Sequence, residues 1–275
     1  MRLNSKIAFI GAGKMAETII SGIIRSKIFS PKQIVISDID KNRSCFIKQK
    51  FKIFAAKDNF EAAKNSDVIF LSVKPQNISE VIGSIYEAID SKKLVVSIAA
   101  GVSLKYLRKK MPKAKIIRVM PNNPCLIGEG ISAVSASKNS GKKEKEFVKS
   151  IFSLLGKVLI IDEKHLDAIT GLSGSGPAFI YSAIDGMLSA GEKLGLSRQN
   201  AKVLTIQTFI GAAKTMEQAD MSAQDLINQV ASPKGTTIEG LKVLDKRKFK
   251  KALFDAVIAA AKRASEIKKS LEGSL

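Results

Sequence analysis

A short apolar run followed by a glycine-rich turn is the feature that most constrains this 275-residue chain. Residues 7–10 are an apolar, β-branched run, and Gly11-Ala12-Gly13-Lys14-Met15-Ala16 follows it directly. In the dinucleotide fingerprint, Gly11 allows the tight turn, Gly13 lets the backbone approach a pyrophosphate, and Ala16 replaces the third glycine. The helix that begins here offers free N–H groups to phosphates. The sequence therefore predicts a dinucleotide-binding strand–turn–helix unit.

Similar apolar runs recur through the first 162 residues and alternate with helical patterns. They lack polar alternation, which is typical of strands buried on both faces. Strand–helix alternation in turn predicts a parallel sheet covered by helices. The expected strands are 7–10, 34–37, 68–73, 94–98, 116–120, 130–135 and 158–161.

No strand pattern follows Asp162. Ser197 and Ser222 are suitable N-caps for two of the helices expected there, and Pro177 suits a first helical turn. The predicted fold is an α/β Rossmann-type parallel-sheet domain, residues 1–162, followed by an all-helical domain, residues 163–275. The expected helices of the second domain are 177–194, 198–218, 223–230, 237–244 and 249–269.

Composition excludes several classes of protein. There are two cysteines, Cys45 and Cys125, without a C-x-x-C motif, and one histidine, so we expect no metal site. The formal net charge is +20, but the lysines are spread along the chain, which favours a solvated basic surface over nucleic-acid binding. No uncharged apolar run is long enough to span a bilayer, and the N-terminus lacks a signal-peptide layout, so we expect a cytoplasmic protein.

The end of the second expected strand leaves the choice of dinucleotide open. Asp38 lies where an acidic residue binds the ribose hydroxyls of NAD. Ser37, Lys41 and Arg43 are equally near and are suited to the 2′-phosphate of NADP. The sequence predicts NADPH or NADH without deciding between them.

Five further segments, in this order and spacing, resemble pyrroline-5-carboxylate reductase along the whole chain. Each segment is moderately specific by itself, and the set is hard to reach by chance. They are Ser72-Val-Lys-Pro-Gln76, Ser97-Ile-Ala-Ala-Gly101, Arg118-Val-Met-Pro-Asn-Asn-Pro124, Gly171-Leu-Ser-Gly-Ser-Gly-Pro-Ala178 and Ala231-Ser-Pro-Lys-Gly-Thr-Thr237.

The resemblance implies an NAD(P)H-dependent reduction of 1-pyrroline-5-carboxylate to L-proline. It places Thr237 beside the imine nitrogen as the catalytic residue, and it implies homodimers with interlocked helical domains that assemble further into decamers. The implied substrate-binding residues are Glu163, Ser232, Gly235, Thr236 and Thr237. The implied cofactor-binding residues are Ile10, Gly11, Ala12, Gly13, Lys14, Met15, Ser37, Asn59, Ser72, Val73, Lys74, Pro75, Ile98, Ala99 and Ala100.

Two positions depart from the family pattern. The family normally has Ser-Pro-Gly-Gly where this chain has Lys234 in place of the first glycine, and Gln229 stands where asparagine is common. If the backbone at Lys234 requires a positive φ, a lysine there costs on the order of 1 kcal/mol. Its ammonium group would in turn place a cation near an anionic ligand.

Three alternative functions remain. A hydroxyacid dehydrogenase would have the same β/α-plus-helical architecture but not the Ser-Pro-x-Gly-Thr-Thr segment. A nucleotide-sensing or nucleic-acid-binding protein has only the basic charge in its favour. A serine hydrolase is disfavoured, because Gly171-x-Ser173-x-Ser175 lacks the last glycine of a hydrolase elbow and follows no strand. His165 lies in a polar turn and is more typical of a surface residue than of a catalytic base.

Overall fold

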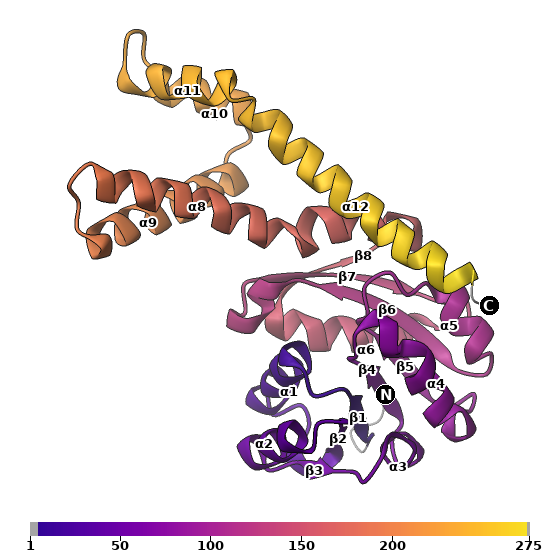
Figure 1. Ribbon diagram of the computed structural model, residues 1–275. Coiled ribbons are helices and arrows are strands. Elements are labelled where there is room, and N and C mark those ends of the chain that lie inside the picture. The colour runs from indigo at the N-terminus through magenta and orange to yellow at the C-terminus, as the bar shows by residue number, and fades with distance from the viewer. Residues whose placement is uncertain (1–4, 274–275) are drawn as a thin grey trace. The chain divides into compact units, whose positions relative to one another are not determined.

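The computed structural model of the chain describes residues 5–273, which divide into two compact units. The first unit comprises residues 5–175 together with 259–273, and the second comprises 176–258. Figure 1 shows the sheet of the first unit and the helices of the second. Each unit is described separately below.

An eight-stranded sheet forms the centre of the first unit, in the order β3-β2-β1-β4-β5-β6-β7-β8. Neighbouring strands are parallel except β6 and β7, which are antiparallel. The order β3-β2-β1-β4-β5-β6 is that of a doubly wound dinucleotide-binding sheet. The strands are β1 (Ile7–Ile10), β2 (Ile34–Ser37), β3 (Phe54–Ala55), β4 (Val68–Leu71), β5 (Leu94–Ser97), β6 (Lys115–Pro121), β7 (Gly130–Ala136) and β8 (Gly156–Ile160).

Helices cover both faces of this sheet because successive side chains of its central strands point to opposite sides. In β1, Phe9 faces one core, formed with α1, α2 and α6, whereas Ala8 faces the other, formed with α3, α4 and α5. Phe9 stacks on Phe70 of β4 at a centroid distance of 4.6 Å. The helices are α1 (Lys14–Arg25), α2 (Lys41–Phe51), α3 (Asn59–Lys64), α4 (Ile78–Ile85), α5 (Leu104–Lys110), α6 (Lys142–Phe152) and α7 (Leu166–Ile169).

The last turns of α12 (Phe249–Gly273) also belong to the first unit. Ile267 lies directly over Gly101, where an added Cβ would stand 2.7 Å from its Cγ2. The Ser103 hydroxyl donates to Glu272 Oε1 at 2.5 Å, and Leu271 packs against the core beneath α5. These contacts attach the C-terminal end of the described chain to the sheet.

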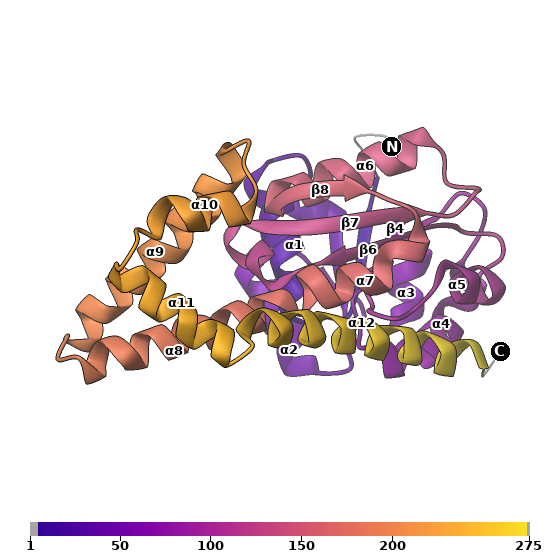
Figure 2. The same cartoon turned by 90° about the horizontal axis from the view of Figure 1, so that it is seen from above.

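The second unit is entirely helical and contains α8 (Gly176–Lys193), α9 (Arg198–Gln218), α10 (Ala223–Val230), α11 (Thr236–Lys246) and the first part of α12. Ser197 and Ser222 cap α9 and α10 as expected, each accepting a backbone N–H. Helices α8 and α9 lie side by side (Figures 1 and 2). Across residues 5–273, no helix is both long enough and apolar enough to cross a membrane.

The expected fold class, an α/β Rossmann-type sheet followed by helices, is confirmed. The sequence patterns missed β3, α3 and α7, because these elements have two, six and four residues. Elements this short span at most two turns or one strand pair and carry no readable periodicity.

We expect Gly156→Ala to destabilise the first unit by more than about 3 kcal/mol, since two costs combine. Gly156 has φ +135° and ψ −153°, a region essentially confined to glycine. An added Cβ would also stand 2.0 Å from the carbonyl oxygen of Gly130 in the paired strand β7. Urea denaturation followed by circular dichroism measures the change.

Gly83→Ala is the matched control for this substitution. Gly83 is exposed on α4, and a Cβ there would meet nothing within 4 Å. Alanine at this position should stabilise the protein by about 0.5–1 kcal/mol. Equal denaturation midpoints for the two variants would contradict the argument for close strand approach at Gly156.

Candidate active site

The turn after β1 brings three strand ends together at one edge of the sheet. Gly11 has φ +97°, and its N–H donates to the carbonyl of Ser37 at the end of β2 (2.8 Å). A Cβ on Gly11 would stand 2.6 Å from the carbonyl oxygen of Ser72, which follows β4. Only glycine fits this position, because both the dihedral angle and the space exclude a side chain.

Helix α1 begins at this turn with an open N-terminus. Gly13 is the N-cap and provides no side-chain hydrogen bond, and a Cβ there would meet nothing within 4 Å. The first N–H groups of α1 therefore remain available to an anion, and the helix dipole favours one there. Ala16 is fully buried, so this turn of the helix packs closely on the sheet.

A cavity of about 460 Å³ lies along this edge of the sheet. Eight of the residues expected to bind the cofactor line it: Ile10, Gly11, Gly13, Ser37, Asn59, Ser72, Val73 and Lys74. The Ser37 hydroxyl donates to Asn59 Oδ1 at 2.8 Å, and Asn59 Nδ2 donates to the Ser84 hydroxyl at 3.1 Å. The Ser72 Oγ is buried without a hydrogen-bond partner among the described residues.

An unpartnered buried hydroxyl in a cavity is costly unless a ligand satisfies it. The open helix N-terminus, the free space over Gly13 and the Ser72 hydroxyl are the features that a dinucleotide site requires, so these residues fit a dinucleotide. NAD(P)H itself supplies the hydride when it is bound.

The remaining expected cofactor residues do not line this cavity. Ala12 is buried beneath the turn, Lys14 and Met15 form the first turn of α1, and Pro75 begins the short helix η2 (Pro75–Asn77). The segment Ile98, Ala99 and Ala100 follows β5, where the Ile98 N–H donates to Leu71 O at 3.1 Å. That bond places the segment at the same edge of the sheet, beside the end of β4.

Charged side chains organise the outer end of the fingerprint turn. Asp38 accepts from the Ala12 N–H at 2.5 Å and from the Asp40 N–H at 2.8 Å, so both of its carboxylate oxygens are engaged. Arg43 Nε donates to the Ala12 carbonyl at 2.6 Å, and its guanidinium pairs with Glu17. These contacts fix the turn from two sides.

Glu17 is the common acceptor in this network, with Lys50 Nζ at 2.8 Å as well as Arg43. Partial burial acts to raise the pKa of Glu17, but the hydrogen bonds and charges of Lys50 and Arg43 outweigh it and hold that pKa below its ordinary value. Sequence reasoning missed this network, since Glu17 and Arg43 are 26 residues apart and meet only after folding.

The segment from Ser232 to Thr237 forms a turn that leads into α11. Lys234 has φ +62°, so the backbone there does adopt the left-handed conformation, and the Gly235 N–H donates to Ser232 O at 2.9 Å. A Cβ on Gly235 would stand 2.5 Å from the Ser232 hydroxyl oxygen. Gly235 is the N-cap of α11, without a side-chain cap bond. The turn therefore collects three hydroxyl side chains at a helix start whose N–H groups are uncapped.

Glu163 lies in the first unit, whereas the Ser232–Thr237 segment lies in the second. Glu163 Oε1 accepts from the Leu104 N–H and from Arg118 Nη1, both at 2.6 Å. The Arg118 side chain is only 4% exposed. A buried guanidinium requires a partner of this kind, so Glu163 links β6 to the start of α5 in this structure.

Several residues that line the cofactor cavity were not expected from the sequence. They include Lys57, Asp58, Asn77, Glu80 and Val81. Lys57 and Asp58 follow the missed strand β3, and predicting that strand would have pointed to them. Within residues 5–273, no group of three or more His, Cys, Asp or Glu side chains is arranged to hold a metal ion.

Comparison with known proteins covers both units of the chain. A family model described as pyrroline-5-carboxylate reductase dimerisation matches residues 163–267, and one described as NADP oxidoreductase coenzyme F420-dependent matches residues 6–101. A pyrroline-5-carboxylate reductase of Synechocystis is 36% identical, covering 97% of this chain and 100% of the relative. The Arabidopsis thaliana reductase is 39% identical, covering 96% of each chain.

Solved structures agree with these matches. The crystal structure of Plasmodium falciparum pyrroline carboxylate reductase with NADP bound has a TM-score of 0.90 and 32% identity, covering 98% of this chain and 100% of that one. The Coxiella burnetii pyrroline-5-carboxylate reductase has a TM-score of 0.84 and 34% identity, covering 96% and 98%.

The fingerprint turn, the cavity beside it and these relatives along nearly the whole chain lead to one conclusion: the chain belongs to the pyrroline-5-carboxylate reductase family, the NAD(P)H-dependent oxidoreductases of proline biosynthesis.

Proposed function

We propose that this chain reduces the C=N bond of 1-pyrroline-5-carboxylate to give L-proline. The cofactor would bind beside the fingerprint turn, and the substrate would bind at the start of α11. The observation that carries the proposal is the similarity to named reductases over 96–97% of the chain. The open dinucleotide cavity supports it independently, because a reductase of this type must bind a nicotinamide cofactor.

The cofactor would lie along the edge of the sheet formed by the ends of β1, β2 and β4. The turn from Ile10 to Met15 would bind the pyrophosphate through backbone N–H groups. Ser37 and Asn59 would contact the adenosine ribose, and Ser72 to Pro75 would lie along the cofactor, with the Ser72 hydroxyl finding its missing partner there. Ile98, Ala99 and Ala100 would pack near the nicotinamide.

The substrate carboxylate would bind at the start of α11. Ser232 and Thr236 offer hydroxyls, and the uncapped N–H groups of Thr236 and Thr237 begin the helix, whose dipole favours a carboxylate there. Gly235, whose own N–H donates to Ser232 O, would form the backbone of the turn beside the carboxylate. Fixing the carboxylate determines which ring carbon faces the cofactor, and positioning of this kind lowers the barrier by several kcal/mol. Thr237 would hydrogen-bond the ring nitrogen directly or through a water that it orients.

Glu163 Oε1 already accepts two hydrogen bonds, so the second carboxylate oxygen of Glu163 would contact the substrate. The same bonds make Glu163 important for the position of α5.

NADPH is the cofactor that the charges favour. Both Asp38 oxygens accept backbone N–H groups, so this carboxylate holds the turn and is poorly placed to bind ribose hydroxyls. Lys41 and Lys57 line the same cavity, and among residues 5–273 the Lys41 Nζ donates only to the Lys57 carbonyl (3.1 Å). Two cations at this end would attract a 2′-phosphate.

The helical region matches a dimerisation domain, so the chain is expected to form an oligomer. We propose residues 1–162 as the dinucleotide-binding domain and 163–275 as the substrate-binding and dimerisation domain. We further propose homodimers with interlocked helical domains, assembled into decamers.

An apolar cavity of about 790 Å³ within the second unit, lined by Phe179, Phe209 and Phe249 among others, would receive side chains of the second copy. A cytoplasmic location and the lack of nucleic-acid binding stay predictions.

The first test follows oxidation of NADPH, and separately of NADH, by the purified protein with and without 1-pyrroline-5-carboxylate. We expect substrate-dependent oxidation that is faster with NADPH at low cofactor concentration.

Replacing Lys41 and Lys57 by alanine should raise the KM for NADPH by roughly tenfold, because charge-assisted contacts to a phosphate are lost, and leave the KM for NADH unchanged. Lys48→Ala, on the exposed face of α2, is the control. Equal effects on both cofactors would refute the selectivity argument.

Thr237→Ala should lower kcat by roughly ten- to hundredfold, since one hydrogen bond to a charged group is lost. The dissociation constant for NADPH, measured by fluorescence titration, should stay the same. Thr237→Ser retains the hydroxyl and should recover most of the turnover. A parallel loss of NADPH binding would assign Thr237 a structural role.

Lys234→Gly should stabilise the protein by about 1 kcal/mol, because a non-glycine residue pays that cost at positive φ. Lys234→Ala removes the same charge but keeps a Cβ, so it should give no such gain. The difference between their urea midpoints isolates backbone strain from charge. Identical midpoints would show that the turn tolerates the lysine without cost.

A further inference from the structure

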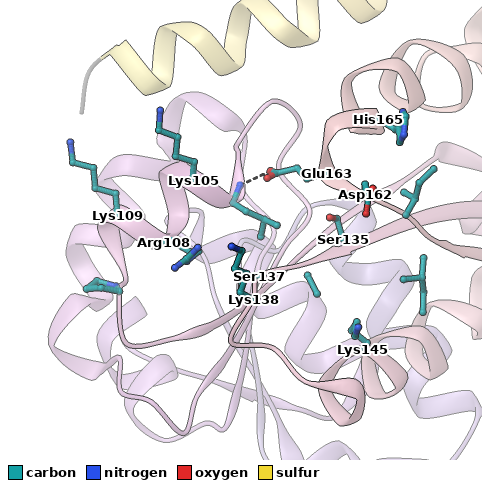
Figure 3. A pocket seen from close by; sticks show the side chains of 15 residues that line it. Lys105, Arg108, Lys109, Ser135, Ser137, Lys138, Lys145, Asp162, Glu163 and His165 are labelled. Atoms are coloured by element: carbon teal, nitrogen blue, oxygen red, sulfur yellow. Dashed lines mark hydrogen bonds between the residues drawn. The ribbon is translucent and has the colours of Figure 1, made fainter.

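Another large cavity, of about 980 Å³, lies within the first unit, and Glu163 is the one residue of its lining that has a role in the reaction proposed above. Its walls come from α5, from the ends of β7 and β8, from α6 and from the turn η6 (Glu163–His165). Figure 3 shows these elements around the opening. Leu104, Pro112, Ile160 and Ile161 provide apolar surface, and Ser135 and Ser137 provide hydroxyls.

The basic end of this cavity lies at the opposite edge of the sheet from the fingerprint turn. Gly11 and Ser72 follow the ends of β1 and β4. By contrast, β7 is antiparallel to β6, and Ser137 at its end donates its N–H to Ile116 O near the beginning of β6 (2.9 Å). A ligand beside Ser137 and Lys138 is therefore separated from the cofactor by the length of the strands.

Cations from separate elements converge on this cavity. Lys105, Arg108 and Lys109 come from α5, Lys138 follows β7, and Lys145 comes from α6. In Figure 3, Lys105 and Lys109 extend at the rim, whereas Arg108 and Lys138 lie toward the centre.

Few carboxylates neutralise Arg108, Lys138 and Lys145. Asp162 and Glu163 line the cavity, but Glu163 Oε1 is engaged by Arg118 and the Leu104 N–H. Lys105 has Glu272 at 4.0 Å. The side chains of Arg108, Lys138 and Lys145 make no ion pair or hydrogen bond within the part of the chain that the structure describes. Like charges that converge without counter-charges are unfavourable unless an anion binds between them.

We propose that this cavity is a binding site for a small polyanion carrying at least two phosphate groups. One phosphate would be bound by the planar guanidinium of Arg108 and the ammonium of Lys138, since arginine binds phosphate oxygens in a bidentate manner. A further phosphate would reach Lys145 or the rim lysines. The apolar wall formed by Ile160 and Ile161 accommodates an organic group, and the cavity volume is typical of small-molecule sites.

A small anion is favoured over a nucleic acid by the shape of the charge distribution. Nucleic-acid surfaces usually carry basic residues in a stripe that follows the phosphate backbone. Here the cations line a concave site with an apolar wall, Ile160 and Ile161, and they come from separate elements.

Isothermal titration calorimetry with inorganic tripolyphosphate tests the proposal. The titration uses the full chain at about 0.15 M salt, where exposed charges are screened. Saturating NADP⁺ blocks the cofactor site. We expect one tripolyphosphate bound per chain. The double variant Arg108→Glu/Lys138→Glu should weaken this binding by roughly tenfold or more, because two attractive contacts become repulsive.

The matched control is Lys48→Glu/Lys92→Glu, which changes the net charge equally at exposed positions outside the cavity. It should bind tripolyphosphate with unchanged affinity, and both double variants should retain reductase activity as proof of folding. A parallel titration with ATP shows whether the source of the phosphates is a nucleotide: tighter binding than tripolyphosphate would indicate that the apolar wall recognises the nucleoside.

Three outcomes would overturn the proposal. The first is no binding of either probe at this salt concentration. The second is an equal loss of affinity in the two double variants, which would indicate only a general effect of net charge. The third is retention of duplex DNA that depends on Arg108 and Lys138 in the absence of tripolyphosphate binding, which would assign the surface to nucleic acid.

Discussion

The close approach of Gly11 to the backbone after β4 is the constraint on which the sheet domain depends. Because the Gly11 N–H bonds to the end of β2 and the Ser72 N–H bonds to Ile10 O at 2.8 Å, three strand ends are joined within one turn. The space that a side chain would fill is already taken by the Ser72 carbonyl. Helix α1 begins at this turn without a side-chain cap, and the buried Ser72 hydroxyl lies at the same place, so the turn that joins the strands also borders the cofactor cavity.

A helix or strand could be predicted from the sequence where its own residues carry a clear pattern. Helix α10 was expected at 223–230 and begins and ends there, because Ser222 caps it and its apolar spacing is regular. The strands were readable because burial on both faces makes them continuously apolar. Strand β3 has only two residues and both are exposed, so no apolar run marks it. Missing β3 concealed Lys57, which the structure brings into the cofactor cavity.

The proposed sites also differ in whether their residues are close together in the sequence. The fingerprint turn and the Ser232–Thr237 turn are each continuous in sequence, so a motif can identify them and even anticipate the positive φ at Lys234. The basic cavity is assembled from Arg108, Lys138 and Lys145, which no local pattern connects. Its existence follows from strand order: the antiparallel β7 returns the chain to the edge where α5 ends, and only the folded sheet shows this.

The helical unit lacks a buried core of its own. Among residues 176–258, only Ala201 and Thr205 are buried, whereas Val203 and Phe254 are more than 60% exposed. Apolar helices in this state cannot offset the conformational entropy lost on folding, so they require further apolar surface. In the proposed homodimer, a second copy would supply this surface. Since the proposed carboxylate site at the start of α11 lies in this unit, its geometry would be fixed by assembly. Catalytic competence and oligomerisation should therefore be lost together on dilution.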